Sequence, residues 1–177
     1  LSSTIDVVGR VGSCHFYNNT IIKTRSAATH ADNTAITFDN YTNIPGSLLF
    51  TNNIFYNTTG TANPFTKVGA GEFIDNQGLI LRNNCIYGYQ EGTISGSGEH
   101  NTANIPDDPA FVRLIEEFTS SNNLVDRDEI LDGLRLATDS PCIGAGIGIP
   151  EDPIFPFSED FWGEPVGDAR NIGAYNH

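Results

Sequence analysis

The sequence predicts an all-β protein built as a short solenoid, that is, a stack of similar coils. The first observation is a motif of an aromatic or aliphatic residue, one spacer, two asparagines and a short apolar run. It stands as FYNNTII at 16–22, FTNNIFY at 50–56 and LRNNCIY at 81–87. The second observation is its spacing. The first asparagines, Asn18, Asn52 and Asn83, are separated by 34 and 31 residues, which lies within the periods of repeat proteins.

Short runs of strand-forming residues flank the two asparagines of each motif. They lie at 13–17, 48–51 and 79–82 before the asparagines and at 21–22, 54–56 and 86–87 after them. These runs suit strands and are too short for helices. Asparagine suits the bend between them because it tolerates left-handed backbone angles. Coils stacked roughly 4.8 Å apart would also let equivalent asparagines hydrogen-bond in a ladder.

A second, weaker repeat lies between the asparagine motifs. AITFDNY at 35–41 resembles GEFIDNQ at 71–77, so each coil should contain at least one further strand and turn. Residues 1–12 already resemble strands of a coil, which leaves the N-terminal face of about three coils uncovered. We expect further coils, another domain or another subunit to cover this face, because open strand edges invite association. The alternative is that these segments are loops of a β-sandwich.

Composition and charge are typical of a secreted, β-rich protein. The chain has 18 glycines, many asparagines and threonines, and only 18% charged residues, with few helical patterns. It has neither a long apolar run nor a signal peptide, so we expect a mature or excised piece of an extracellular protein. The net charge of −13 argues against binding to nucleic acid or anionic membranes, since both need clustered Lys and Arg.

The cysteines and histidines predict no cofactor. Cys14, Cys85 and Cys142 lie in apolar surroundings and are interpreted as small buried residues. No spacing of Cys or His typical of a zinc site occurs. The sequence leaves Ca²⁺ open, although no calcium-loop motif is present.

The repeats end at about residue 100. Residues 1–100 are therefore assigned to the coils, and residues 101–177 to the C-terminal coil and cap of the same domain. Apolar residues at helical spacing predict a short helix over 110–118. A second short helix is expected with Asp126 as its N-cap and Glu129 as its capping-box partner.

The last third of the chain carries the most specific signal. It reads Asp-Pro-Ala-Phe at 108–111, Leu-Arg-Leu at 134–136, Ser-Pro-Cys-Ile-Gly-Ala-Gly at 140–146, and a final stretch from Asp160 to Tyr175. These sequences resemble the C-terminal part of right-handed parallel β-helix proteins of the pectate-lyase-like superfamily. The chain departs from that pattern by a long stretch from Arg113 to Leu131 and by Val166 in place of arginine. The resemblance implies a right-handed parallel β-helix with a C-terminal cap that contains one or two short helices.

The resemblance also implies a polysaccharide ligand, because extended glycans lie along the stacked strands in that superfamily. The candidate carbohydrate-binding residues are Tyr56, Tyr87, Tyr17, Tyr41 and Tyr89. Ile22, Tyr56 and Tyr87 fall in one column, each four residues after a first asparagine. If the column points outward, the two tyrosines offer a flat surface to sugar rings. If it points inward, they belong to the core.

No catalytic motif is present. A polysaccharide lyase needs a positioned cationic base and a hydrolase needs two carboxylates, but the cations of the repeats form no pattern. We therefore expect a non-catalytic extracellular module, part of a longer carbohydrate-active protein, that binds polysaccharide. A neutral glycan such as xylan avoids the charge penalty. The alternatives are the C-terminal fragment of a β-helix polysaccharide lyase or glycoside hydrolase, and a structural filament or adhesin subunit.

Overall fold

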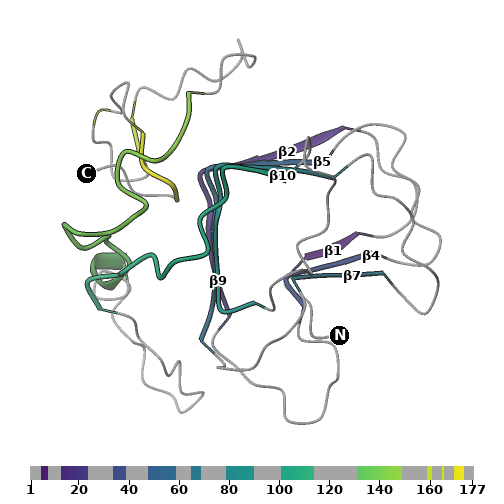
Figure 1. The fold of residues 1–177 in the computed structure, drawn as a ribbon, viewed down its shortest axis with the longest axis horizontal. Coiled ribbons are helices and arrows are strands. Elements are labelled where there is room, and N and C mark those ends of the chain that lie inside the picture. Colours follow the sequence, from purple (N-terminus) through teal and green to yellow (C-terminus); the bar gives the residue numbers. More distant parts are fainter. Residues whose placement is uncertain are drawn as a thin grey trace.

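The computed structural model describes residues 5–7, 13–23, 34–38, 48–58, 65–68, 79–89, 101–113, 131–148, 159–160, 165 and 170–173. This part of the chain is mostly β-strand with almost no helix, which confirms the prediction of an all-β protein. Its ten strands form three sheets in which all neighbouring strands are parallel (Figure 1).

Each sheet collects equivalent strands from successive repeats. The first sheet consists of β1 (Ile5–Val7), β4 (Ile36–Phe38) and β7 (Thr66–Val68). The second sheet consists of β2 (Cys14–Tyr17), β5 (Leu48–Thr51), β8 (Leu79–Arg82) and β10 (Asn101–Thr102). The third sheet consists of β3 (Thr20–Lys23), β6 (Ile54–Asn57) and β9 (Cys85–Tyr87). The chain therefore visits the three sheets in the same order in each repeat.

The register stacks the asparagine motifs directly on one another. The strands before the asparagines, β2, β5 and β8, pair in register along their whole length. On the third sheet Ile22 pairs with Tyr56 and Tyr56 with Tyr87, which confirms the predicted column. Equivalent residues of the motifs therefore lie side by side on adjacent strands, although the motifs are separated by 34 and then 31 residues. The extra residues of the longer repeat lie in the connections between strands.

The first asparagine of each motif forms the bend between the second and third sheets. Asn18, Asn52 and Asn83 have positive φ angles of 52, 57 and 49°, as the sequence predicts for a residue that tolerates the left-handed region. Their backbone N–H groups donate to the neighbouring repeat, as in the 3.2 Å bond from Asn18 to the carbonyl of Thr51. The bend thus combines a local backbone preference with a bond between repeats.

A fourth motif extends the stack beyond the predicted end of the repeats. In Thr-Ala-Asn-Ile at 102–105, Ala103 takes the bend position with φ of 54°. Asn101 and Thr102 form β10, and Ile105 makes a parallel bridge to Cys85. This motif is hard to recognise in the sequence because alanine stands where the other three have asparagine.

The second asparagine of each motif builds a hydrogen-bonded ladder. Each Nδ2 donates to the next Oδ1, from Asn19 to Asn53 at 2.9 Å, from Asn53 to Asn84 at 3.0 Å, and from Asn84 to Asn104 at 2.9 Å. Asn53 and Asn84 have no exposed surface, and buried polar groups with such bonds stabilise a unique structure. The predicted ladder is confirmed, with the second asparagines as its members.

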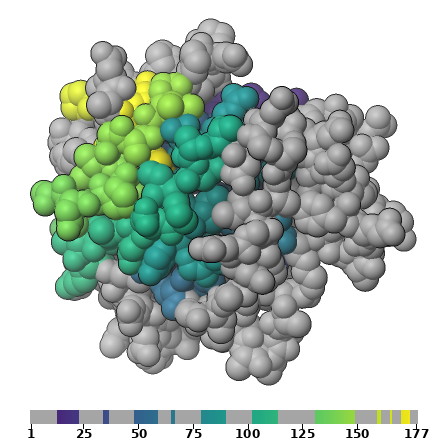
Figure 2. Space-filling view, viewed as in Figure 1, coloured from purple at the N-terminus to yellow at the C-terminus, as the bar shows by residue number. Residues whose placement is uncertain are grey.

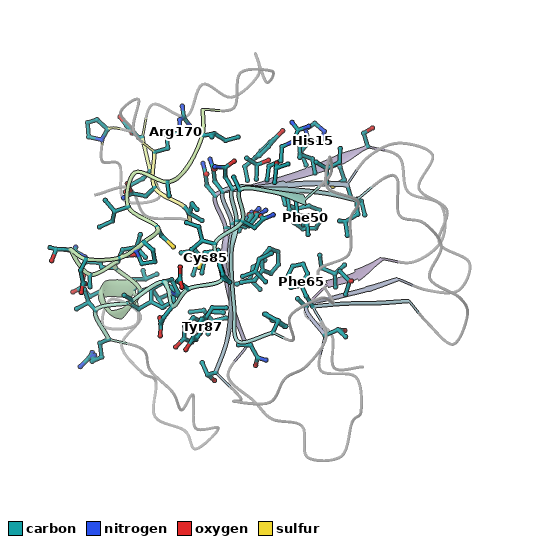
Figure 3. The ribbon with its side chains drawn as sticks, in the orientation of Figure 1. His15, Phe50, Phe65, Cys85, Tyr87 and Arg170 are labelled. Atoms are coloured by element: carbon teal, nitrogen blue, oxygen red, sulfur yellow. The ribbon has the colours of Figure 1, made fainter. Side chains whose placement is uncertain are left out.

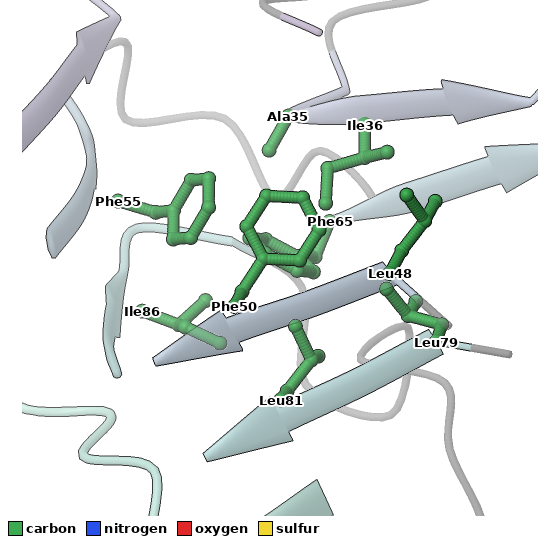
Figure 4. Close-up of a cluster of buried hydrophobic side chains, with 9 residues drawn as sticks. All are labelled: Ala35, Ile36, Leu48, Phe50, Phe55, Phe65, Leu79, Leu81 and Ile86. Atoms are coloured by element: carbon green, nitrogen blue, oxygen red, sulfur yellow. The ribbon is translucent and has the colours of Figure 1, made fainter. Parts of the chain in front are cut away.

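The inner faces of the three sheets share one interior core (Figure 4). Its buried members are Ala35, Ile36, Leu48, Phe50, Phe55, Phe65, Leu79, Leu81 and Ile86. Phe50 stacks on Phe16 with ring centroids 4.5 Å apart and meets Phe55 edge-on at 5.8 Å. Burying one such side chain stabilises by about 1.5–3 kcal/mol. Because all three sheets contribute, this core holds them together.

The pairing in the first sheet differs from the pairing that the second, weaker repeat predicts. The expected equivalence of 35–41 with 71–77 is wrong, because β4 pairs with β7, Ile36 opposite Thr66 and Phe38 opposite Val68. The physical reason is burial just before β7. Phe65 fills the interior core, and its carbonyl accepts the N–H of Ile36 at 3.0 Å. Residues 71–77 lie outside the described residues.

Residues 106–113, 131–148 and 170–173, called here the C-terminal segment, lie against the outer face of the third sheet (Figure 1). Figure 2 shows residues 131–148 of the segment, in green, beside the teal residues of the chain. The contact is a second apolar cluster in which Ile54 and Cys85 from the sheet meet Cys142 and Ile172 from the segment. The segment therefore covers one side of the stack.

The predicted cap motifs contact one another within the C-terminal segment. Phe111 bridges Leu136, and Gly146 bridges Arg170, both antiparallel. The hydroxyl of Ser140 donates to the carbonyl of Pro109 at 2.6 Å. The sequences at 108–111, 134–136 and 140–146 thus belong to one packed unit.

The predicted helix over 110–118 is wrong at its start. Ala110 has a φ of 51°, which a right-handed helix excludes. Its carbonyl accepts the N–H of Ala137 at 2.8 Å, so this stretch pairs with the chain around 133–137. The remainder of the predicted helix, Asp126 and Glu129 lie outside the described residues, while 131–133 are helical. No helix in the described part is long and apolar enough to cross a membrane.

Candidate functional site

The outer face of the third sheet carries the first two candidate tyrosines. Tyr56 on β6 and Tyr87 on β9 are neighbours in register, and their rings stack with centroids 5.2 Å and planes 25° apart. Phe55 and Ile86, the adjacent residues, belong to the interior core. Because side chains alternate along a strand, Tyr56 and Tyr87 point away from that core. Figure 3 shows Tyr87 on the side opposite Phe50 and Phe65.

The C-terminal segment packs against this pair. Phe111 meets Tyr56 edge-on at 5.5 Å, and Ile22 lies next to Tyr56 on its other side in register. Both tyrosines are half-buried. Since the two ring faces are turned to each other, the pair offers ring edges rather than one flat surface. Tyr56 and Tyr87 thus point outward from the sheet, and Tyr56 also packs against Phe111 of the C-terminal segment.

The outer face of the second sheet holds the third candidate. Cys14 and Phe16 pack against the interior core, so His15 and Tyr17 point outward from β2; Figure 3 shows His15 on that side. Nδ1 of His15 is hydrogen-bonded to the hydroxyl of Tyr17, and the rings meet edge-on at 5.6 Å. His15 is exposed and Tyr17 is half-buried. An imidazole and a phenol are thus paired at the surface.

Two files of outward-facing residues run along the second sheet. One contains Tyr17, Thr51, Arg82 and Thr102, and the other contains His15, Leu49 and Ile80. Arg82 and Thr102 are exposed, whereas Thr51 is buried. This face, called here the second-sheet surface, therefore combines a phenol, an imidazole, a guanidinium and two aliphatic side chains.

Sequence reasoning did not connect His15 with Arg82. They are distant in the chain, and only the parallel pairing of β2, β5 and β8 puts them on one surface. The sequence does identify the first of these files, because its members have the same position in each repeat. Tyr17, Thr51 and Arg82 each immediately precede the first asparagine of a motif. Residues at equal offsets from a repeated motif share a face of a stack.

Of the other two candidate tyrosines the structure describes Tyr89, which is not part of these surfaces. Tyr89 packs against the interior core, with its ring edge-on to Phe65 at 5.3 Å. Burial raises the pKa of the Tyr89 hydroxyl, and among the described residues this hydroxyl has no hydrogen-bond partner. Tyr41 lies outside the described residues.

The described ranges bring together no group of three or more His, Cys, Asp or Glu side chains that would suit a metal ion. Lys67 lies on the first sheet and Arg82 on the second. The chemistry at the two surfaces is therefore that of hydrogen bonds, aromatic rings and one exposed guanidinium.

No match to the chain was found among curated proteins. A family model described as disaggregatase related matches residues 13–146. The matched range contains all four asparagine motifs, the second-sheet surface, and Tyr56 and Tyr87. Since the match covers well over half of the sequence, the chain belongs to the disaggregatase related family.

Proposed function

We propose that the chain is a right-handed parallel β-helix of the pectate-lyase-like superfamily and that it acts as a non-catalytic, extracellular, polysaccharide-binding module. The parallel pairing, the fixed order of the sheets and the asparagine ladder support the fold. The description of the family names no substrate. The argument for binding therefore rests on the surfaces of the stack.

The observation that carries the proposal is the second-sheet surface with His15, Tyr17 and Arg82. An aromatic ring packs against the apolar face of a sugar, and a guanidinium offers five donors in a fixed geometry to sugar oxygens. Strands about 4.8 Å apart repeat these positions on the length scale of a sugar residue. A linear glycan that runs across the strands would meet Tyr17 and Arg82 along one file and His15 along the other.

A neutral glycan such as xylan is the preferred ligand. The net charge of −13 repels polyanions over long distances, although Arg82 provides a local positive charge. The edges of Tyr56 and Tyr87 add two hydroxyl-bearing rings on the adjoining sheet. In a longer carbohydrate-active protein, further coils, another domain or another subunit would cover the N-terminal edges at β1, β2 and β3.

Affinity electrophoresis in gels that contain xylan, or polygalacturonate as an acidic comparison, tests this proposal. We expect xylan to retard the protein, and Tyr17→Ala or Arg82→Ala to weaken its binding roughly tenfold, or about 1.4 kcal/mol. Val112→Ala is the matched control, because Val112 is 61% exposed on the C-terminal segment and should not change the retardation. Absence of retardation by every glycan tested would refute the proposal.

A second pair of variants separates the two surfaces. Tyr56→Ala and Tyr87→Ala will leave binding intact but lower stability if these residues mainly pack under the C-terminal segment. Loss of binding at unchanged stability would move the site to the third sheet.

Two further measurements test the alternatives. Unsaturated or reducing ends released from a glycan would identify a catalytic fragment, with the hydrogen-bonded His15 and Tyr17 as the acid–base pair. Light scattering that grows with concentration would indicate a filament or adhesin subunit.

A further inference from the structure

Two cysteines meet between the third sheet and the C-terminal segment. Cys85 belongs to β9, and Cys142 belongs to the segment. Both are free thiols without exposed surface, and both belong to the second apolar cluster together with Ile54 and Ile172. Figure 3 shows Cys85 on the side of β9 that faces the segment. Residues distant in the sequence thus bring two sulfurs into one buried cluster.

Backbone bonds hold each cysteine in place. The N–H of Cys85 donates to the carbonyl of Asn53 at 2.8 Å, and the carbonyl of Cys142 accepts the N–H of Ile172 at 2.9 Å. The N–H of Cys142 donates to the hydroxyl oxygen of Ser140 at 3.2 Å. Both positions are therefore fixed by neighbours that do not involve sulfur.

The Cys85 thiol donates to the backbone carbonyl of Asp107 at 3.3 Å. The neighbouring Cys85 thiol lowers the pKa of the Cys142 thiol, helped by the Ser140 hydroxyl, whereas the neighbouring Cys142 thiol and burial raise the pKa of the Cys85 thiol. The thiolate is the reactive form of cysteine. The lowered pKa makes Cys142 the more readily ionised of the two thiols.

We propose that Cys85 and Cys142 are a modification site at which a disulfide fastens the C-terminal segment to the third sheet. The oxidant is a low-molecular-weight disulfide such as oxidised glutathione. The Cys142 thiolate attacks it, forms a mixed disulfide and releases one glutathione thiolate. The Cys85 thiolate then attacks the Cys142 sulfur and releases the second. Two protein thiols are oxidised, one glutathione disulfide is reduced to two thiols, and two protons pass to them.

The Cys85–Cys142 disulfide would add a covalent link between the C-terminal segment and the third sheet, which otherwise meet through apolar contacts and hydrogen bonds. Linking Cys85 to Cys142 closes a long loop, and a disulfide stabilises mainly by restricting the unfolded chain, more so for longer loops. Cys14 is a control provided by the chain itself, because it lies on β2 and packs against the interior core rather than the second cluster. It should stay reduced.

The test uses the full chain equilibrated with reduced and oxidised glutathione, both in the native state and during refolding from urea. Remaining thiols are alkylated, and peptides are mapped by mass spectrometry. We expect one linked peptide pair that contains Cys85 and Cys142, with Cys14 alkylated. The melting temperature should rise by an amount of the order of 10 °C and return to its initial value on reduction.

Three variants complete the test. Cys14→Ser should behave as the parent chain does, whereas Cys85→Ser and Cys142→Ser should show no oxidant-dependent shift in melting temperature. Because serine in the buried cluster can itself disturb folding, the peptide map of the unsubstituted chain decides. Three alkylated cysteines under both conditions, a link through Cys14, or a linked form that melts at a lower temperature would each overturn the proposal.

Discussion

Asn84 accepts two hydrogen bonds from Asn53 through a single oxygen. The backbone N–H and the Nδ2 of Asn53 both lie 3.0 Å from Oδ1 of Asn84. Nδ2 of Asn84 then donates to Asn104 and to the carbonyl of Phe50. Every ladder amide has the same polarity, so the bonds polarise one another in series. Asn84 is thus one of the two inner ladder amides, with Asn53, whose side chains are hydrogen-bonded on both sides.

Asn84→Ala should cost about 2–4 kcal/mol of unfolding free energy, because it removes four hydrogen bonds and takes the acceptor from the buried backbone N–H of Asn53. Asn19→Ala is the matched control. Asn19 is exposed at the end of the ladder, and its loss should cost about 1 kcal/mol or less. Urea unfolding at constant pH measures both, and equal losses would show that burial does not set the strength of the ladder.

Asn52→Gly should loosen the C-terminal segment. The Asn52 amide donates to the carbonyl of Ile147 at 2.8 Å and accepts its N–H at 3.0 Å. Glycine keeps the left-handed bend, so the expected loss of about 1–2 kcal/mol reports these two bonds. Hydrogen exchange at the Ile147 amide measures it.

Asn18→Gly is the control for that prediction, since it occupies the equivalent bend. Its buried Oδ1 has no hydrogen-bond partner in the described part of the chain, so glycine should change stability by less than about 0.5 kcal/mol. A similar loss at both positions would mean that the bend, and not the contact with Ile147, is being measured.

Gly88→Ala should be strongly destabilising. Gly88 has a φ of 78°, and an added methyl group would overlap the backbone oxygen of Asn57, which cannot move without disturbing β6. The left-handed conformation and the overlap together should cost about 3 kcal/mol. Gly144→Ala separates the two effects, because its φ is 66° and nothing lies near the new methyl. It should cost about 1 kcal/mol. Thermal unfolding compares the two, and equal shifts would exclude the overlap.

Tyr89→Phe should be neutral or stabilising by up to about 1 kcal/mol at pH 7, since it removes a buried hydroxyl that lacks a partner among the described residues. The effect should grow in alkali. Burial raises the pKa of folded Tyr89 above its ordinary value of 10.0, so the unfolded chain loses this proton first. The parent should then lose stability as pH rises above about 10, more steeply than Tyr89→Phe. Parallel pH profiles in urea unfolding would contradict this.

The strands beside the asparagines could be predicted because their signals are local. The runs at 48–51 and 79–82 coincide with β5 and β8. The alternation of side chains on β6 also follows from sequence. The sequence does not show which side of β6 faces the interior, because whether Tyr56 or Phe55 is buried there depends on the other sheets. The helix predicted from Ala110 failed for the same reason, because pairing with residues near 137 overrode a helical apolar pattern.

By itself the sequence determined the period, the bends at Asn18, Asn52 and Asn83, and the existence of a ladder, because asparagine carries both a left-handed backbone preference and a self-complementary amide. Only the tertiary structure decided that β4 pairs with β7, that the C-terminal segment covers the third sheet, and that Cys85 meets Cys142. These features depend on which apolar surfaces bury each other across long stretches of chain. Such contacts leave no periodic signal in any one segment.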